Sequence, residues 1–112
     1  MELTKCAEYV AHKLFKIYKD SLKSGNSKNE AKMFNGAREV HNFFYELSFE
    51  DFLESIRELS RNNHVNVSWA SNIFAALELE SKMIYDFENR FKNNAYKLLD
   101  IIYKLRKIVL WS

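Results

Sequence analysis

Three histidines and one cysteine are the side chains of this chain best suited to metal binding or nucleophilic catalysis. His12, His41 and His64 lie far apart, and none stands at a metal-ligand spacing from another histidine or from Cys6. Cys6 and His12 are six residues apart, so a helix would place them on different faces. The sequence also has no phosphate-binding loop, nucleophile elbow or zinc ribbon. We therefore expect no catalytic residues, no metal site and no cofactor, and a protein that is not an enzyme.

Lysines offer a second kind of chemistry, the binding of phosphate groups. An amphipathic helix is predicted over about residues 2–24, because apolar residues recur there every three to four positions. The side opposite the apolar face carries Lys5, Lys13, Lys16, Lys19 and Lys23. Such a face is either simply solvated or a stripe that binds phosphates, and the sequence leaves both interpretations open.

The formal net charge of +2 is unevenly distributed along the chain. Residues 1–48 carry +2, residues 49–80 carry −4 and residues 81–112 carry +4. Any function in nucleic-acid binding must therefore account for an acidic middle segment.

Composition restricts the elements that can position these side chains. The 112 residues include no proline and two glycines, which argues against an all-β fold with many tight turns. Hydrophobic residues make up 47% of the chain, enough for the core of a single domain spanning residues 1–112. The longest apolar run is shorter than the roughly 18 residues of a membrane span, and residues 1–5 lack a signal-peptide pattern. With a single cysteine, we expect a cytoplasmic protein without a membrane partner.

Capping signals predict the next two helices. Ser27 and Glu30 form a capping-box pattern, which begins a second helix expected over most of residues 28–47, with a possible break at Gly36. Ser48, with Asp51 three residues later, begins a third helix at about residues 49–62.

A change of hydrophobic period follows the third helix. Val65, Val67 and Trp69 alternate with polar residues, and a second alternating run begins at Ile73. These runs predict a β-hairpin over about residues 65–79, with a turn at residues 70–72.

The last predicted element is a single long helix over residues 82–110. Its 29 residues would span about 43 Å, against a radius of gyration near 13 Å for a domain of this size. A long helix could fold across the domain and bury two of its sides, or it could form a homodimer seam. From the length we expect its C-terminal half to project or to pack against a partner, with a homodimer favoured. The expected interface residues are Tyr85, Tyr96, Leu99, Tyr103, Leu110 and Trp111.

Three helices, a two-stranded hairpin and a final helix resemble, in their order, a winged-helix domain, with a tri-helical core and the hairpin as its wing. Leu59, the segment 64–67 and the segment 73–79 look like the helix exit and wing of small winged-helix proteins, the YjcQ-like ones among them, of low-GC Gram-positive bacteria and their phages. Those proteins typically follow the second wing strand with Leu-Thr-x-x-Gly-Ile. Here Glu80 stands in the place of the Thr and Met83 in the place of the Gly.

The resemblance implies a helix-turn-helix scaffold of the DNA-binding type, used in transcription regulation or as a phage accessory protein. Candidate contacts to double-stranded DNA lie on the second helix, on the third helix and its exit, and on the wing: Lys28, Asn29, Lys32, Arg57, Arg61, Asn62, Asn66 and Asn72. The third helix also carries Glu50, Asp51, Glu54 and Glu58, which a phosphate backbone would repel.

Two functions therefore remain open. One is a DNA-binding regulator, which a positive face including Lys16, Lys19 or Lys28 beside the third helix would favour. The other is a protein–protein interaction module that keeps the scaffold, has lost its DNA contacts and binds a basic surface of a host or phage protein through its acidic third helix.

Overall fold

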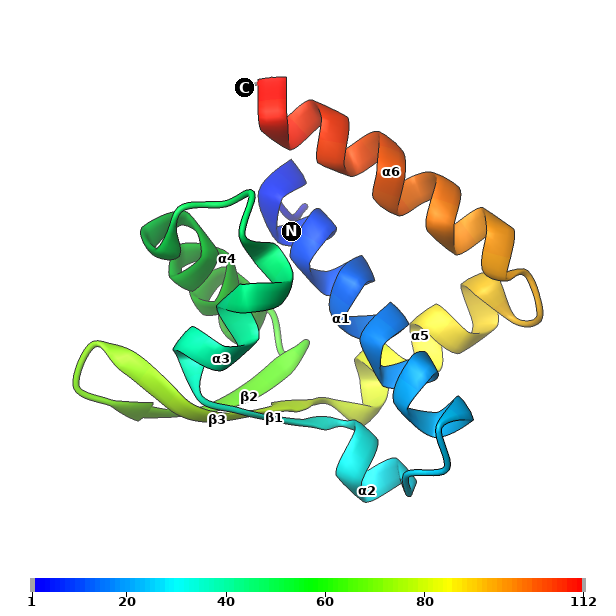
Figure 1. Cartoon of the computed structure of the whole chain (residues 1–112), viewed down its shortest axis with the longest axis horizontal. Helices are drawn as coiled ribbons and strands as arrows, with labels where there is room; N and C mark the ends of the chain where they lie inside the picture. Colours follow the sequence, from blue (N-terminus) through cyan, green and yellow to red (C-terminus); the bar gives the residue numbers. More distant parts are fainter. Residues whose placement is uncertain (1, 112) are drawn as a thin grey trace.

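The computed structural model describes residues 2–111 and places a long helix, α1, at the centre of the molecule. Figure 1 shows α3 and α4 on one side of α1 and α6 on the other, with a small sheet below. The helices are α1 (Lys5–Lys23), α2 (Lys28–Ala31), α3 (Ala37–His41), the 3-10 turn η1 (Asn42–Phe44), α4 (Phe49–Arg61), α5 (Ser81–Phe91) and α6 (Ala95–Trp111). The strands are β1 (Met33–Asn35), β2 (Val65–Ala70) and β3 (Ile73–Leu79). The expected class, mainly helical with a small β element, is confirmed.

The sheet has three antiparallel strands in the order β1-β3-β2. Strands β2 and β3 form the hairpin that the alternating pattern predicts. Ser71, in the turn between them, has a φ of 60°. In the register, Leu77 of β3 lies between Phe34 of β1 and Val67 of β2. The hairpin is therefore extended by a strand that the sequence analysis did not predict.

Side-chain caps fix where three helices begin. The Thr4 side chain accepts a hydrogen bond from the N–H of Ala7 at 3.2 Å and starts α1. Ser27 and Glu30 form the predicted capping box of α2, and Ser48 caps α4 by accepting from the N–H of Asp51 at 3.1 Å. These short polar side chains satisfy N–H groups that the first turn of a helix leaves unpaired.

The prediction of a helix over most of residues 28–47 was wrong. The helix ends after four residues, β1 follows, and the chain becomes helical again only at Ala37. Phe34 is buried opposite Leu77, and pairing with β3 replaces the helical hydrogen bonds there. Gly36 then takes a φ of +82°, which strains any other residue, so the predicted break at Gly36 is present.

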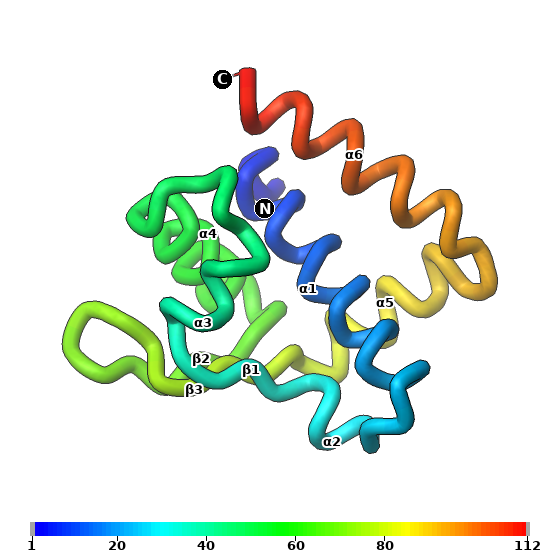
Figure 2. The backbone as a smooth tube through the Cα atoms, in the orientation of Figure 1, coloured from blue at the N-terminus to red at the C-terminus, as the bar shows by residue number. Residues whose placement is uncertain are grey.

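The single helix predicted over residues 82–110 was also wrong. It is interrupted between Phe91 and Ala95, where Lys92 has a φ of 30° and the Asn94 side chain caps α6 by accepting from the N–H of Lys97 at 3.0 Å. Figures 1 and 2 show α6 turning back and running beside α1, which it contacts. The turn lets both Phe91 and Leu98 be buried, whereas a straight helix would carry Leu98 away from the core. The length of the predicted helix therefore no longer supports the expectation that its C-terminal half projects from the domain.

His12 of α1 is part of the aromatic packing in the core. His12, buried on α1, lies 4.8 Å from Phe87 between ring centroids, and its Nδ1 is 2.6 Å from the carbonyl oxygen of Glu8. Burial lowers the pKa of His12 and favours its neutral form. The surroundings of His12 are thus those of a core residue.

Candidate interaction surfaces

The two arginines proposed for DNA contact, Arg57 and Arg61, are held by a neighbouring carboxylate on α4. A guanidinium nitrogen of Arg57 lies 3.3 Å from Glu54, and one of Arg61 lies 3.9 Å from it. Arg57 also donates to the carbonyl oxygen of Asn72 at 3.4 Å and lies over the Trp69 ring at 5.1 Å. Arg57 therefore links α4 to the hairpin, and its charge is partly neutralised there.

Other carboxylates on α4 leave the face of this helix acidic. Glu58 accepts hydrogen bonds from the backbone N–H and the hydroxyl of Thr4, at 2.7 and 2.9 Å, and so ties α4 to the start of α1. Glu50 and Asp51 are exposed, and their carboxylates form no ion pair within residues 2–111. The acidity predicted for this helix is therefore present at its surface.

A groove of about 440 Å³ runs between α4, the start of α1 and the end of α6. We call it the acidic groove, because four of its described lining residues are acidic and none is lysine, arginine or histidine. It is lined by Thr4, Cys6, Glu46, Leu47, Ser48, Asp51, Glu54, Ser55, Glu58, Val109 and Leu110. Its negative charge and apolar end suit a basic side chain with an aliphatic stem.

Glu46, at the base of the acidic groove, has a side chain only 4% exposed. The Tyr9 hydroxyl donates a hydrogen bond to its carboxylate, and the Lys13 ammonium lies 3.5 Å away. Burial alone would raise the pKa of Glu46, but the hydrogen bond from Tyr9 and the charges of Lys13 and Arg106 outweigh it, and the pKa is lowered. Glu46 is therefore ionised at neutral pH.

Sequence analysis missed Glu46, because nothing in its local pattern marks it. Its position beside Tyr9 and Lys13 depends on how the segment before α4 packs against α1. The acidic residues of α4, by contrast, were visible as a run of carboxylates along one predicted helix.

The remaining candidate DNA contacts fall into two separate places. Lys28, Asn29 and Lys32 line a pocket of about 360 Å³ beside α5, and Lys32 is 2.8 Å from Glu78. Figure 1 shows α2 and the turn of the hairpin at opposite ends of the sheet. Asn72 lies in that turn, so the structure does not bring it together with Lys28 or Lys32.

On the hairpin side, Asn66 is exposed on β2, and its register partner is Glu78. Asn62 caps the end of α4 by donating to the carbonyl oxygen of Glu58 at 2.9 Å. Asn62 thus has a structural partner, and Asn66 lies near an acidic side chain.

No family model matches this chain, and neither a curated protein nor a solved structure does. Its function must therefore be inferred from its own geometry.

The lysines of α1 do not form a positive face with α4. Lys16 pairs with Asp20 at 2.6 Å, and Lys19 pairs with Glu88 of α5 at 2.9 Å. Both line a pocket beside the turn between α5 and α6, which Figure 1 places across α1 from α4. The arrangement that would have favoured DNA binding is therefore not found.

Large apolar side chains on α5 and α6 are exposed to solvent. Tyr96 is 86% exposed and Trp111 is 88% exposed. The exposed set contains all the expected interface residues, Tyr85, Tyr96, Leu99, Tyr103, Leu110 and Trp111, and also Ile108. Tyr85 lies on α5, so the turn at Lys92 separates it from the α6 residues.

Cys6 lies half-buried at the acidic groove and accepts a hydrogen bond from the Ser55 hydroxyl at 3.1 Å. Burial raises the pKa of its thiol, which keeps it protonated at neutral pH. Within residues 2–111, no three histidine, cysteine or acidic residues are grouped so that they could hold a metal ion. Over the same residues, no helix combines the length and apolar character that crossing a membrane requires.

Proposed function

We propose that this chain is a winged-helix module that binds a basic segment of a partner protein through the acidic groove. The winged-helix assignment is supported by the order of the elements and by the strand order β1-β3-β2. The protein-binding function is supported by one observation above all. The surface formed by α4 carries a groove with four acidic lining residues and no basic one among those described.

Electrostatics favours a basic peptide over DNA at this surface. Glu50 and Asp51 project carboxylates without a paired cation among residues 2–111, and Glu54 occupies both Arg57 and Arg61. A lysine or arginine of a partner gains attraction from the carboxylates of Glu50 and Asp51, whereas a phosphate backbone meets repulsion from them.

Asp51 supplies the sharpest test, because it lines the groove and its neighbour Glu50 does not. The probe is a synthetic peptide of alternating lysine and leucine, titrated by calorimetry. Asp51→Lys is expected to weaken binding about tenfold, since a carboxylate becomes a like charge. Glu50→Lys makes the same charge change in the same first turn and is expected to have a smaller effect. Equal losses in both variants would contradict a specific groove.

DNA binding by the same scaffold is the second candidate. The observation that favours it is that Arg57, Arg61 and Asn72 gather where α4 meets the hairpin. An electrophoretic mobility-shift assay with an AT-rich duplex at about 50 mM salt tests DNA binding, since binding through phosphates is strongest at low salt. A mobility shift of the duplex that Arg57→Ala and Arg61→Ala abolish would favour DNA binding over binding of the basic peptide.

We further propose that the chain forms a homodimer through α6. Tyr96, Leu99, Tyr103 and Leu110 are exposed at spacings of three, four and seven residues, the spacing at which two helices pack along a seam. A second α6 would cover these side chains from water.

A further inference from the structure

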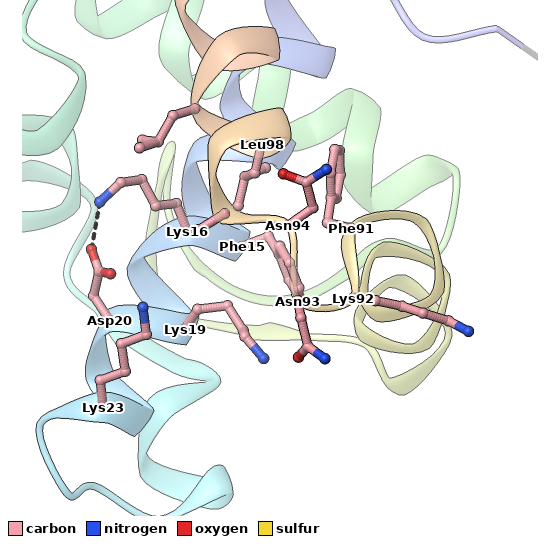
Figure 3. Close-up of a pocket in the computed structure, with 12 residues that line it drawn as sticks. Phe15, Lys16, Lys19, Asp20, Lys23, Phe91, Lys92, Asn93, Asn94 and Leu98 are labelled. Atoms are coloured by element: carbon pink, nitrogen blue, oxygen red, sulfur yellow. Dashed lines mark hydrogen bonds and ion pairs between the residues drawn. The ribbon is translucent and has the colours of Figure 1, made fainter.

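Four lysines border a cavity that neither the proposed peptide-binding function nor the proposed DNA-binding function uses. This cavity, of about 350 Å³, lies between the C-terminal half of α1 and the turn joining α5 to α6. Figure 3 shows its lining residues: Phe15, Lys16, Lys19, Asp20, Lys23, Phe91, Lys92, Asn93, Asn94, Ala95, Leu98 and Leu99. Its volume falls in the range of small-molecule sites.

The cavity has an apolar floor. Phe15, Phe91 and Leu98 are core residues whose side chains form this floor. The Lys19 ammonium lies 6.0 Å from the centroid of the Phe15 ring, so charge and apolar surface adjoin. An apolar body can therefore rest against the floor while a polar head stays near the lysines.

The rim is positively charged. Four lysines and one aspartate line the cavity. Lys16 pairs with Asp20 and Lys19 with Glu88, whereas Lys23 makes no ion pair or hydrogen bond within residues 2–111. In Figure 3, Lys16, Lys19 and Lys23 follow α1 along one side of the cavity, and Lys92 points away from it. Among the described lysines of α1 at this rim, Lys23 is thus unpaired, and the charges of Lys16 and Lys19 are partly compensated by Asp20 and Glu88.

Two features of the cavity wall opposite the α1 lysines add to the preference for an anion. The first turn of α6, a helix of 17 residues, begins at Ala95 in the cavity wall, where the helix dipole favours negative charge. The side-chain amide of Asn93 adds a hydrogen-bond donor.

We propose that this cavity binds a small amphiphilic anion, with its carboxylate or phosphate head between the α1 lysines and the start of α6 and its apolar body on Phe15 and Leu98. The site borders the C-terminal half of α1, whereas the acidic groove borders its start, and the two share no lining residue. The proposal is therefore independent of the function proposed for the acidic groove.

The test is an NMR titration of the full chain with octanoate and octyl phosphate as probes. Both are expected to give saturable shifts at the Asn93 side-chain amide and the Ala95 backbone N–H. Inorganic phosphate, which has no apolar body, is expected to bind at least several-fold more weakly. Octylamine, with the opposite charge, is expected to leave these signals unchanged. Equal effects of octylamine and octanoate would contradict a site selective for anions.

The double variant Lys16→Gln/Lys23→Gln is expected to weaken octanoate binding roughly fivefold, because it removes the partly exposed charge of Lys16 and the exposed charge of Lys23. Lys97→Gln/Lys104→Gln, which removes two exposed charges outside the cavity, is the matched control and is expected to bind like the parent chain. Unchanged affinity in the first variant would overturn the proposal. So would an absence of saturable shifts with both probes, or binding only to phosphatidylglycerol vesicles and not to free octanoate.

Discussion

Glu46 is held by interactions that distant parts of the chain bring together. Tyr9 and Lys13 reach it from α1, and the charge of Arg106 acts on it from α6. Because its pKa is lowered in the folded chain, ionised Glu46 stabilises the fold above the unfolded pKa, near 4.5, and this stabilisation is lost as the pH falls through the folded value.

We therefore expect Glu46→Gln to reduce the free energy of unfolding by about 1–3 kcal/mol at neutral pH, the usual size of a hydrogen bond to a charged group. The difference from the parent chain should shrink as the pH falls below about 4.5. Urea denaturation at a series of pH values measures both effects.

His12 and His64 add a second contribution to the dependence of the free energy of unfolding on pH. Burial lowers the pKa of each, so acid begins to favour the unfolded chain already near pH 6.5, in the parent and in the Glu46→Gln variant alike. The Glu50→Gln variant, which changes an exposed carboxylate without an ion pair among residues 2–111, serves as the control. A loss in Glu46→Gln that stays constant down to pH 3 would contradict the role given to Glu46.

Local signals in the sequence predicted the single-residue caps but not the partners across the fold. Ser27, Ser48 and Glu30 act within one helical turn, so their roles could be predicted from spacing. The role of Arg57 as a DNA contact stays a prediction, but its contacts with Trp69 and Asn72 of the hairpin were not predicted. The position of Arg57 depends on how α4 packs against β2, and the periodicity of residues along a helix cannot predict that packing.

Among the elements, those with a strong internal pattern were predicted well. α1, α4 and the hairpin lie within a few residues of their expected bounds. β1 has only three residues and is held by pairing with β3, so it has too few positions to show a period. The turn at Lys92 has no glycine or proline, and burial of Phe91 and Leu98 determines it instead.

Gly36 lets the chain pass from β1 into α3, and it supplies a test of this transition. A Cβ at Gly36 would meet the carboxylate of Glu39, an exposed side chain that can move aside, so the strain of the positive φ is the main cost of a substitution. Gly36→Ala is expected to lower the free energy of unfolding by about 1–2 kcal/mol, measured by urea denaturation.

Gly25→Ala is the matched control for this change. Gly25 also has a positive φ, of +98°, but a Cβ there would meet nothing within 4 Å. Gly25→Ala should therefore lose a similar amount, about 1–2 kcal/mol, from backbone strain alone. The double variant Gly36→Ala/Glu39→Ala should lose as much as Gly36→Ala, because the Glu39 side chain can move aside. A much larger loss at Gly36, recovered by Glu39→Ala, would contradict this explanation.

The return of α6 along α1 changes the basis of the proposed dimer, because no half of the helix projects. Exposed apolar residues on α6 now support it, but Lys97 and Lys107 lie on the same helix, whereas Lys104 is paired with Asp100. Two copies would bring these like charges close together. The dimer should therefore form more readily as salt screens them.

Sedimentation of the chain at rising salt concentration measures this association. We expect the dimer fraction to increase with salt, and Leu99→Lys/Tyr103→Lys to keep the chain monomeric. A 13 kDa species at every concentration and salt level would exclude the dimer.

The central claim is that the acidic groove, and not the junction of α4 with the hairpin, is the site of partner binding. A map of backbone amide shifts on adding the lysine–leucine peptide tests it most directly. We predict shifts at Cys6, Ser48, Asp51 and Ser55, which line the groove. Shifts confined to Ser71, Asn72 and Arg61, together with shifts of the same residues on adding duplex DNA, would contradict the claim.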